Sequence, residues 1–455
     1  MRIRELRMVG TMLNFHPSVW TFVNQHSGGA SLLPRLRRAN IMIPVNNPDG
    51  YLRLLPPSLC KLDLTLELTY NVAPWKIIQE QSAAGKDAAM QVAWALFHSL
   101  PSMFRNLSEL WVHSGLDGIP MRLLESVSNF SQLRELQLQH SGAVFDQAAL
   151  EKLSHIPPLR RLEIRIDLGD SQGESALDFG EGFQHLVEVR IQGHITDLRA
   201  FFQSSRCTNI VEFVLYIDTF DMDTIVVELP LLLSSINNTV TKLSFNFDYP
   251  IDSGLVHFAT LFGPLLAFGA VTSFYVETQG DFGLHMSDAD LQSFANAWPH
   301  LTFFRFDDAG SGPPPNEAEL ELPTIASVIA FARCCPALEF LWFDALDVRA
   351  LPPASQVPAI AHPTLKHLSS TRLIGGQDVN LLDLAVIIDR LCPEFETPAS
   401  VRQKDFPEEE PAEETPRLWE LVSILLAAMQ RRRREDEGTD GVPEAERRYV
   451  ALIAR

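Results

Sequence analysis

The side chains with the strongest potential for recognition chemistry lie in three short segments near the C-terminal end of the sequence. They are Tyr275 and Glu277; then Phe303, Arg305 and Asp307; and finally Phe340, Trp342 and Asp344. Aromatic rings and arginine are enriched at the energetically dominant centres of protein interfaces. Within each segment the residues are two positions apart, which places them on one face of an extended strand. We therefore predict a binding site here for a basic, partly apolar segment of a partner protein.

The acidic members of this set determine the charge of the predicted site. If the three segments are neighbouring strands, about 4.8 Å apart, then Glu277, Asp307 and Asp344 form a row of like charges. Such a row lowers the stability of the sheet until a basic ligand offsets it. The alternative is that inserts such as residues 310–323 cover the rings, so that these aromatic residues belong to the core.

The sequence contains none of the motifs in which catalytic or metal-binding residues usually occur. The thirteen histidines form no HExxH or HxH pattern, and the five cysteines form no CxxC pair. Gly180 and Gly182 do not extend to GxGxxG, and neither GxxxxGK(S/T) nor GxSxG is present. We therefore expect no enzymatic activity, no cofactor, no metal and no small-molecule substrate.

The elements that must position the predicted site are repeats with the spacing apolar-x-x-apolar-x-apolar. Copies start at Leu59, Leu107, Leu133, Leu159, Leu186, Ile210, Val240, Val271, Leu301 and Leu338, with weaker outer candidates at Leu36 and Leu365. The starting points are mostly about 24 to 37 residues apart. The shorter spacings lie within the period of leucine-rich repeats, and the spacing increases toward the C-terminus. The interval from Leu59 to Leu107 is about two periods, and we expect no strand within it.

Each copy predicts one strand with one buried face, and the stretches 121–127, 147–153, 288–298 and 324–334 have the apolar spacing of helices. One strand and one helix bury their apolar faces only by stacking on neighbouring copies. The predicted fold is therefore an α/β, irregular leucine-rich-repeat solenoid with parallel strands on the concave face and helices on the convex face. An ordinary α/β domain is the alternative, but no Gly-rich strand-to-helix turn supports it.

Residues interleaved between the buried strand positions are expected to line the concave face. On the earlier strands these residues are mostly polar and of mixed charge. They are Glu109, Trp111, His113, Glu135, Gln137, Gln139, Arg161, Glu163, Arg165, Glu188, Arg190, Gln192, Glu212, Val214, Tyr216, Lys242, Ser244 and Asn246. The contrast with the aromatic later strands is why we place the binding site at the C-terminal end.

The charge of the chain limits its partners. A formal net charge of −20 over 455 residues repels phosphate backbones and anionic membranes, so we expect neither nucleic acid nor membrane as a partner. No apolar run approaches the ~20 residues that cross a bilayer, and the N-terminus lacks a signal-peptide pattern. The scattered cysteines fit a reducing compartment. We therefore expect a cytoplasmic or nuclear protein.

The two ends of the chain differ in composition from the repeats between them. Residues 1–30 are expected to form an N-terminal helical cap, 31–395 the solenoid, and 396–416 an acidic linker rich in Pro and Glu. Residues 417–455 are expected to form a helical tail in which Leu418, Leu421, Val422, Leu425 and Met429 share an apolar face. Arg431 to Arg434 suit the C-terminal end of that helix, and a nuclear import signal is the functional alternative.

The phrases FRNLSELWV, IPPLRRLEI and CCPALEFLWF, together with the irregular repeats and acidic tail, resemble the fungal F-box and leucine-rich-repeat proteins. The resemblance covers about residues 30 to 395. In that family a helical F-box docks on the Skp adaptor of a cullin ubiquitin ligase, and the repeats present the substrate. The F-box begins with Leu-Pro-x-Glu-hydrophobic, which residues 1–30 do not contain, so this segment is either a cap or an F-box remnant.

The resemblance implies a protein-interaction scaffold that serves as a substrate-recognition subunit of an SCF-type ubiquitin ligase, with the Skp adaptor as a partner. Two alternatives remain at this point. One is a free-standing leucine-rich-repeat adaptor, and the other is a regulator of small GTPases. A hydrolase is the least expected function, because its motifs are missing.

Overall fold

The computed structural model of the chain describes residues 3–8, 22, 25–26, 32–44, 52, 55–67, 91, 95–114, 126–138, 143–169, 177, 179–219, 221–247, 256–278, 284–308, 321–358, 360, 362, 364–375, 380–393 and 418–436. It divides into two compact units. Unit 1 comprises Met1–Thr219 and Ser234–Thr239, and unit 2 comprises Phe220–Leu233 and Val240–Arg455. Each unit is described by itself.

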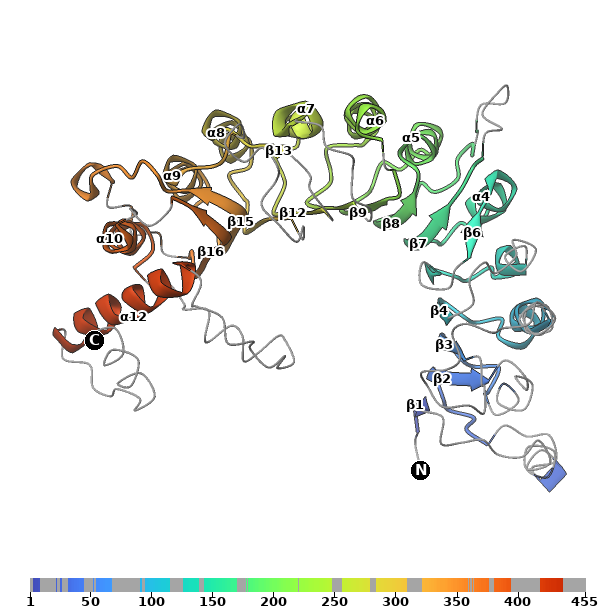
Figure 1. Cartoon of the computed structure of the whole chain (residues 1–455). Coiled ribbons are helices and arrows are strands. Elements are labelled where there is room, and N and C mark those ends of the chain that lie inside the picture. Colours follow the sequence, from blue (N-terminus) through green and yellow to red (C-terminus); the bar gives the residue numbers. More distant parts are fainter. Residues whose placement is uncertain are drawn as a thin grey trace, which may run out of the picture. The chain divides into compact units, whose positions relative to one another are not determined.

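Unit 1 is built on parallel strands that follow one another in chain order. They are β1 (Glu5–Met8), β2 (Arg38–Pro44), β3 (Lys61–Glu67), β4 (Glu109–Ser114), β5 (Glu135–Gln137), β7 (Arg161–Ile166), β8 (Glu188–Gly193) and β9 (Glu212–Ile217), with the short β6 (Val144–Phe145) beside β7. The register keeps equivalent residues opposite one another. Leu62, Leu110, Leu136 and Leu162 thus form one row, and each is fully buried. Helices α4 (Gln147–Ser154) and α5 (Ile195–Ser204) lie on one side of these strands (Figure 1).

Unit 2 repeats the same arrangement with longer copies. Its parallel strands are β10 (Lys242–Phe247), β12 (Ser273–Thr278), β14 (Phe303–Asp308), β15 (Phe340–Asp347) and β16 (His367–Ile374), and a separate two-stranded sheet pairs β11 (Val256–His257) with β13 (Leu284–His285). The helical segments are most of α6 (Met222–Ser235), α7 (Phe258–Phe262), η4 (Gly263–Ala267), α8 (Asp288–Ala297), α9 (Ile325–Cys334), η6 (Ala354–Gln356), α10 (Leu381–Leu391) and α12 (Leu418–Asp436).

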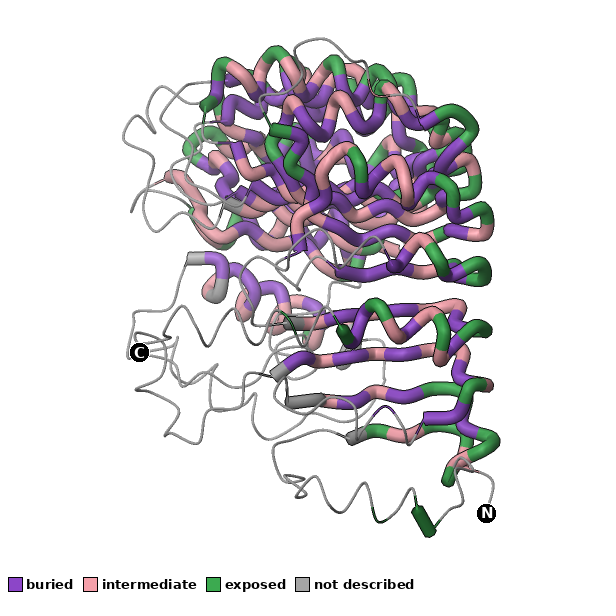
Figure 2. The backbone as a smooth tube through the Cα atoms, turned by 90° about the vertical axis from the view of Figure 1, so that its right-hand side faces the viewer, coloured by how far each residue is buried: buried purple, intermediate pink, exposed green. Residues whose placement is uncertain are grey.

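Burial alternates along the strands, as expected for a sheet with one face against helices. In β8 and β12 every second residue is buried, and the interleaved residues are half-buried (Figure 2). Side-chain caps fix where several helices begin. Asp146 accepts a hydrogen bond from the Ala149 amide at the start of α4, and the Ser287 side chain accepts one from Asp290 at the start of α8. The fold is an irregular leucine-rich-repeat solenoid of the α/β class.

The repeat positions predicted from the sequence are confirmed. All twelve predicted copies, including the weak ones starting at Leu36 and Leu365, carry a strand of the sheet. Strand β3 pairs directly with β4, so the double-length interval between them adds no strand to the ladder. The helices expected at 147–153, 288–298 and 324–334 are α4, α8 and α9. Of the stretch 121–127, residues 126 and 127 begin a 3-10 turn, and the preceding residues lie outside the described part.

The N-terminal segment contains a strand where we expected a helical cap. Strand β1 pairs in parallel with β2, with Leu6 opposite Ala39 and Met8 opposite Ile41. The signal was present in the sequence, because Ile3, Leu6 and Met8 have the spacing of the other copies. Most of residues 9–31, including the helix-like stretch from Ser18, lie outside the described residues.

The tail helix packs with a different face from the one predicted. Helix α12 lies beside α10 and β16, the last strand in the sheet order. The buried apolar residues of α12 are Trp419, Val422 and Leu426, whereas Leu421, Leu425 and Met429 are half-buried. Apolar residues occur on nearly all sides of this helix, so the hydrophobic pattern alone does not fix its orientation. Arg433 forms an ion pair with Asp389 of α10, which helps to anchor α12 as a cap on the last repeat.

The core of unit 2 is dominated by aromatic rings that link one repeat to the next. Phe274 in β12 is fully buried, and its ring contacts Phe245, Phe258, Phe262, Trp298 and Phe304 at centroid distances of 5.1 to 6.1 Å. The indole nitrogen of Trp298 donates a hydrogen bond to the carbonyl oxygen of Leu265 over 3.2 Å. Such contacts join strands and helices of neighbouring repeats into one hydrophobic layer.

Replacing Phe274 with alanine is expected to destabilise unit 2 strongly, because it removes a ring shared by several repeats. Loss of a buried phenylalanine costs about 3–5 kcal/mol of the free energy of unfolding. Chemical denaturation followed by circular dichroism measures this loss. As a control, Val227→Ala on α6, where the side chain is 57% exposed, should change the free energy of unfolding by less than about 0.5 kcal/mol. Equal effects of the two substitutions would contradict the assigned core.

Candidate functional site

The structure brings the eight residues of the predicted site together on three adjacent strands of unit 2. Tyr275 of β12 lies opposite Arg305 of β14, which in turn lies opposite Trp342 of β15. Phe303 lies opposite Phe340 in the row before, and Glu277 lies opposite Asp307 in the row after. The set is therefore one continuous surface, here named the aromatic face. It consists of Tyr275, Glu277, Phe303, Arg305, Asp307, Phe340, Trp342 and Asp344.

Arg305 is at the centre of the aromatic face. Its guanidinium carbon lies 5.4 Å from the centroid of the Tyr275 ring and 5.0 Å from that of the Trp342 ring. It therefore has an aromatic neighbour on each adjacent strand, and each such cation–π contact contributes about 0.5–1 kcal/mol at a partly exposed site. The guanidinium also forms an ion pair with Asp307 on its own strand. These contacts hold Arg305 and its two aromatic neighbours in one arrangement.

The other rings of the aromatic face are stacked in register. Phe303 and Phe340 are nearly parallel, with centroids 4.7 Å apart and an angle of 12° between the planes. The Trp342 ring is parallel to Phe340 at 6.2 Å, and His367 of β16 extends the cluster at 5.8 Å from Phe340. The four aromatic residues of the predicted site are half-buried, while their strand neighbours Phe274, Phe304 and Leu341 point to the other side and are fully buried. The rings are thus not part of the core.

We expected Glu277, Asp307 and Asp344 to form a row of like charges that no cation of the protein offsets. This expectation is wrong for Asp307 and Asp344. Asp307 is paired with Arg305, and Asp344 is paired with Arg372 of β16. Arg372 was missed because β16 is the weakest of the predicted copies. Asp344 is also 3% exposed, so it lies beneath the surface formed by the rings. The acidic groups therefore offset cations of the protein itself, and a basic ligand is not needed to neutralise them.

Glu277 differs from the other two carboxylates. It accepts a hydrogen bond of 2.6 Å from the Tyr275 hydroxyl and forms no ion pair among the described residues. Burial and the bond to Glu277 both raise the pKa of the Tyr275 hydroxyl above its ordinary value. Tyr275 consequently stays protonated and keeps donating to Glu277 at physiological pH. Among the described residues, Glu277 is therefore the one acidic side chain of the aromatic face without a cationic partner.

The corresponding face of unit 1 is a network of ion pairs between neighbouring strands. Lys61 pairs with Glu109 at 2.8 Å, Arg161 with Glu188 at 3.1 Å, and Arg190 with Glu212 at 2.5 Å. Arg165 pairs with Asp218 at 2.9 Å, which connects β7 to the end of β9. Of the residues expected to line this face, Gln137, Glu163 and Val214 are buried, and Gln139 lies outside the described residues.

The negative charge of one carboxyl on this face is not fully offset by neighbouring cations. Burial, followed by the nearby Glu109 carboxylate, raises the pKa of Glu135 above its usual value, although Arg161 acts in the opposite direction. Glu109 and Glu135 lie opposite each other on β4 and β5, which explains their repulsion. The polar side chains of unit 1 mainly satisfy one another, so this face has less free binding capacity than the aromatic face.

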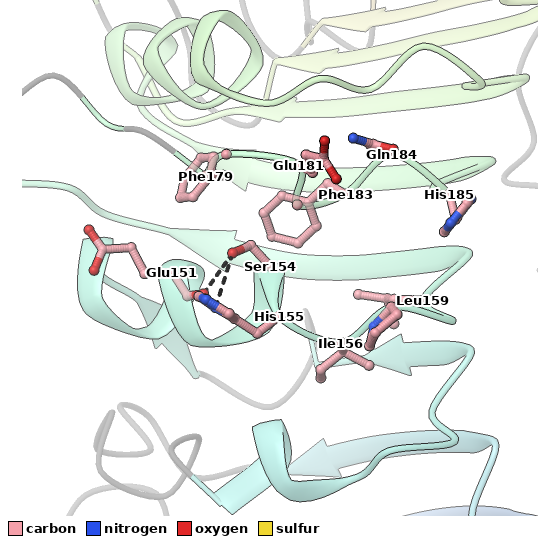
Figure 3. A pocket seen from close by; sticks show the side chains of 13 residues that line it. Glu151, Ser154, His155, Ile156, Leu159, Phe179, Glu181, Phe183, Gln184 and His185 are labelled. Atoms are coloured by element: carbon pink, nitrogen blue, oxygen red, sulfur yellow. Dashed lines mark hydrogen bonds between the residues drawn. The ribbon is translucent and has the colours of Figure 1, made fainter.

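A pocket of about 600 Å³ opens beside the end of α4 in unit 1 (Figure 3). Two of its polar side chains are bonded to the backbone: Ser154 donates to the carbonyl oxygen of Glu151 at 2.7 Å, and His155 Nδ1 lies 2.6 Å from the same oxygen. The Gly180 and Gly182 pair lies in its wall. A side chain at Gly182 would place its Cβ 2.4 Å from Ser154 Cβ, so this glycine permits the close approach to α4. Gly182 is thus a packing feature, whereas Gly180 has a φ of +58° with nothing within 4 Å of its Cβ position and serves the turn.

Three further observations concern the reactivity of the cysteines, metal binding and membrane-spanning helices. Burial raises the pKa of the Cys335 and Cys392 thiols to about 12, which keeps them protonated and unreactive. Among the described residues, no group of three or more His, Cys, Asp or Glu side chains could hold a metal ion. Within that same part of the chain, no helix has the length and apolarity needed to cross a membrane.

Comparisons with known proteins found similar solved structures but no match by sequence. No family model matches the chain, and no curated protein matches its sequence. Similar solved structures include a leucine-rich-repeat protein of Leptospira interrogans, with 12% identity, a TM-score of 0.34, and coverage of 80% of this chain and 66% of that one. Another is described as a novel circular leucine-rich-repeat structure, with 10% identity, a TM-score of 0.26, and coverage of 75% and 34%, respectively.

The chain thus spans less than two thirds of the length of either structure. At this level of similarity the two proteins provide no argument about partners or activity. The fold assignment rests on the strand register and on the helices that cover the sheet.

Replacing Arg305 with methionine is expected to destabilise unit 2, because it removes two cation–π contacts and leaves Asp307 without its cation. We expect a loss of about 1–3 kcal/mol in the free energy of unfolding, measured by urea denaturation. Arg349→Met is the matched control, since Arg349 is 52% exposed and pairs with Asp347 at the surface; it should cost less than about 1 kcal/mol. The central role assigned to Arg305 would be refuted if the control were equally destabilising.

Proposed function

We propose that this protein is a protein-interaction scaffold that binds its partner on the aromatic face of unit 2. The observation that carries the proposal is the pair of stacked rings, Phe303 and Phe340, beside the Tyr275–Arg305–Trp342 sandwich. All five side chains are half-buried, so part of each ring or guanidinium group remains open to a ligand. Aromatic residues and arginine dominate the energetics of protein interfaces.

The arrangement favours a partner because its side chains are already ordered. The ion pairs and ring contacts around Arg305 fix the conformations of several large side chains before binding. A ligand then loses less free energy to the ordering of these side chains, which otherwise costs about 0.5–1.5 kcal/mol for each immobilised side chain. A flat array of rings on parallel strands suits an extended, partly apolar segment that lies across the strands.

The charges of the aromatic face limit which side chains the partner segment can carry. Asp307 and Asp344 are paired within the protein, whereas Glu277 carries a negative charge at the rim without a cation beside it. We infer that the partner segment is mainly apolar and places one basic side chain next to Glu277. The basic character of the ligand thus comes from a single position and not from a run of positive charges.

Replacing Phe340 and Trp342 together with alanine should abolish partner capture while leaving the fold intact. The central aromatic residues of an interface contribute at least about 2 kcal/mol each, so we expect recovery of the partner to fall at least about 30-fold. Affinity capture from the native organism, quantified by mass spectrometry against the unmodified protein, measures this loss. Leu382→Ala on α10, where the side chain is 54% exposed, is the control. Unchanged recovery by a folded double variant would rule out the aromatic face as the site.

We further propose, from the resemblance to fungal F-box and leucine-rich-repeat proteins, that the scaffold presents substrates to an SCF-type ubiquitin ligase in the cytoplasm or nucleus. The free state of all five cysteines is consistent with these reducing compartments. The N-terminal segment departs from that family, because it lacks the F-box signature and contains strand β1. A free-standing adaptor, or a regulator of small GTPases, uses the same binding surface without the ligase.

The ligase role predicts that the Skp adaptor copurifies with the full chain at a stoichiometry near one to one. The measurement is quantitative mass spectrometry of the captured complex. The Phe340 and Trp342 double variant should lose its substrate but keep the adaptor, because an adaptor-binding segment would lie outside the aromatic face. Absence of the adaptor from a capture that retains another partner would leave the free-standing scaffold as the function.

A further inference from the structure

Arginine recurs along the edge of unit 1 where the strands begin. The residue directly before each strand lies in a row, because its backbone oxygen accepts hydrogen bonds from the following repeat. Four members of this row are Arg4, Arg37, Arg134 and Arg160, and all four are exposed. The Arg37 amide donates to Arg4 O at 2.9 Å, and the Arg160 amide donates to Arg134 O at 2.7 Å. Each pair therefore occupies two adjacent strands. The row is named the arginine edge.

The arginine edge has no carboxylate partner in the part of unit 1 that the structure describes. Among the described residues, none of the four guanidinium groups forms an ion pair; Arg37 donates instead to the carbonyl oxygen of Ser58 at 3.1 Å. Acidic side chains do occur in the next row, but basic residues of the sheet face already pair with most of them. Glu109, Glu188 and Glu212 have Lys61, Arg161 and Arg190 as partners. A chain with a net charge of −20 thus keeps two pairs of arginines that form no ion pair among the described residues.

A hollow of about 390 Å³ lies between the second pair of arginines. Its walls include Arg134 and Arg160, with Gln132 and His185 beside them. Two arginines, a glutamine and a histidine therefore line one depression at the surface, together with Ser131, Pro157 and Pro158. None of these side chains participates in the aromatic face, which lies in unit 2.

We propose that the arginine edge binds an acidic segment of a partner protein, with one carboxylate seated in the hollow between Arg134 and Arg160. A guanidinium presents its N–H donors as a planar fork that matches the two oxygens of a carboxylate. Adjacent strands are about 4.8 Å apart, which lets two guanidinium groups contact one carboxylate from opposite sides. Side chains on the same face of an extended peptide are about 6.6–7 Å apart. The next acidic residue of the segment can then lie at the side of the hollow that His185 lines.

A polypeptide fits this surface better than a nucleic acid. The two arginine pairs are separated in the row by Cys60 and Ser108, so positive charge occurs at two points and not as a continuous track. Nucleic-acid binding requires several phosphates to be neutralised at once, and the net charge of −20 opposes a long polyanion. A few carboxylates can bind at short range, because charges farther away than about 8 Å are screened at physiological ionic strength.

The test uses the full chain and a fluorescein-labelled ten-residue peptide of alternating glutamate and serine, with binding followed by fluorescence anisotropy. The same peptide with glutamine in place of glutamate should not bind. Arg134→Gln together with Arg160→Gln is expected to weaken binding at least about 30-fold, because charge-assisted hydrogen bonds are lost on both sides of the carboxylate. The lysine pair, R134K with R160K, should lose about 3- to 10-fold, since it keeps the charge but not the planar fork.

The matched control is Arg333→Gln together with Lys366→Gln in unit 2. It removes the same two charges from exposed positions and should change the affinity for the peptide less than about 2-fold. Equal weakening by both double variants would overturn the proposal, because the binding would then depend on net charge alone. A ten-nucleotide single strand that binds tighter than the peptide, and depends on Arg134 and Arg160, would also overturn it in favour of a nucleic acid. Circular dichroism confirms that each variant is folded.

Discussion

In-register hydrogen bonding between parallel strands is the constraint on which the other features of each unit depend. Every residue lies opposite its equivalent in the next repeat. A residue type that recurs at one position of the repeats therefore forms a row in which neighbours are about 4.8 Å apart. Rows of leucine such as Leu62, Leu110 and Leu136 become a continuous core. Rows of charged residues become ion-pair networks, and a row of rings becomes a stack. The aromatic face and the arginine edge are both products of this repetition.

The same register explains why charges on the sheet are resolved between neighbours. A like-charged row is unfavourable at such short spacing, and in unit 1 acids are paired with bases on neighbouring strands, as in Lys61–Glu109 and Arg161–Glu188. In unit 2, Arg372 pairs with Asp344 of the neighbouring strand, whereas Arg305 pairs with Asp307 on its own strand. The four arginines of the arginine edge have no such ion pair among the described residues.

The spacing of apolar residues was enough to predict the strands, because a period of two with one buried face leaves little freedom in where along the chain each strand lies. It also placed the eight residues of the aromatic face on adjacent strands. It did not reveal how their charges are paired, since Arg372 lies on a copy with few apolar residues, nor that Asp344 is buried. The orientation of α12 could not be predicted either, because apolar residues such as Trp419, Ile424, Ala427 and Met429 lie on several sides of that helix. Pairing and orientation depend on three-dimensional neighbours, which a linear pattern does not contain.

The long interval between β3 and β4 has a consequence for how this protein can change over time. The sheet continues from Leu62 to Leu110 without loss of register, although the connecting chain is about twice the usual length. Doubling the length of a flexible loop adds only about 0.6 kcal/mol to the cost of closing it. Added sequence in this connection therefore costs the sheet little as long as its buried residues Leu96, Phe97 and Leu100 are kept, and new sequence can be acquired there while the strand register is preserved.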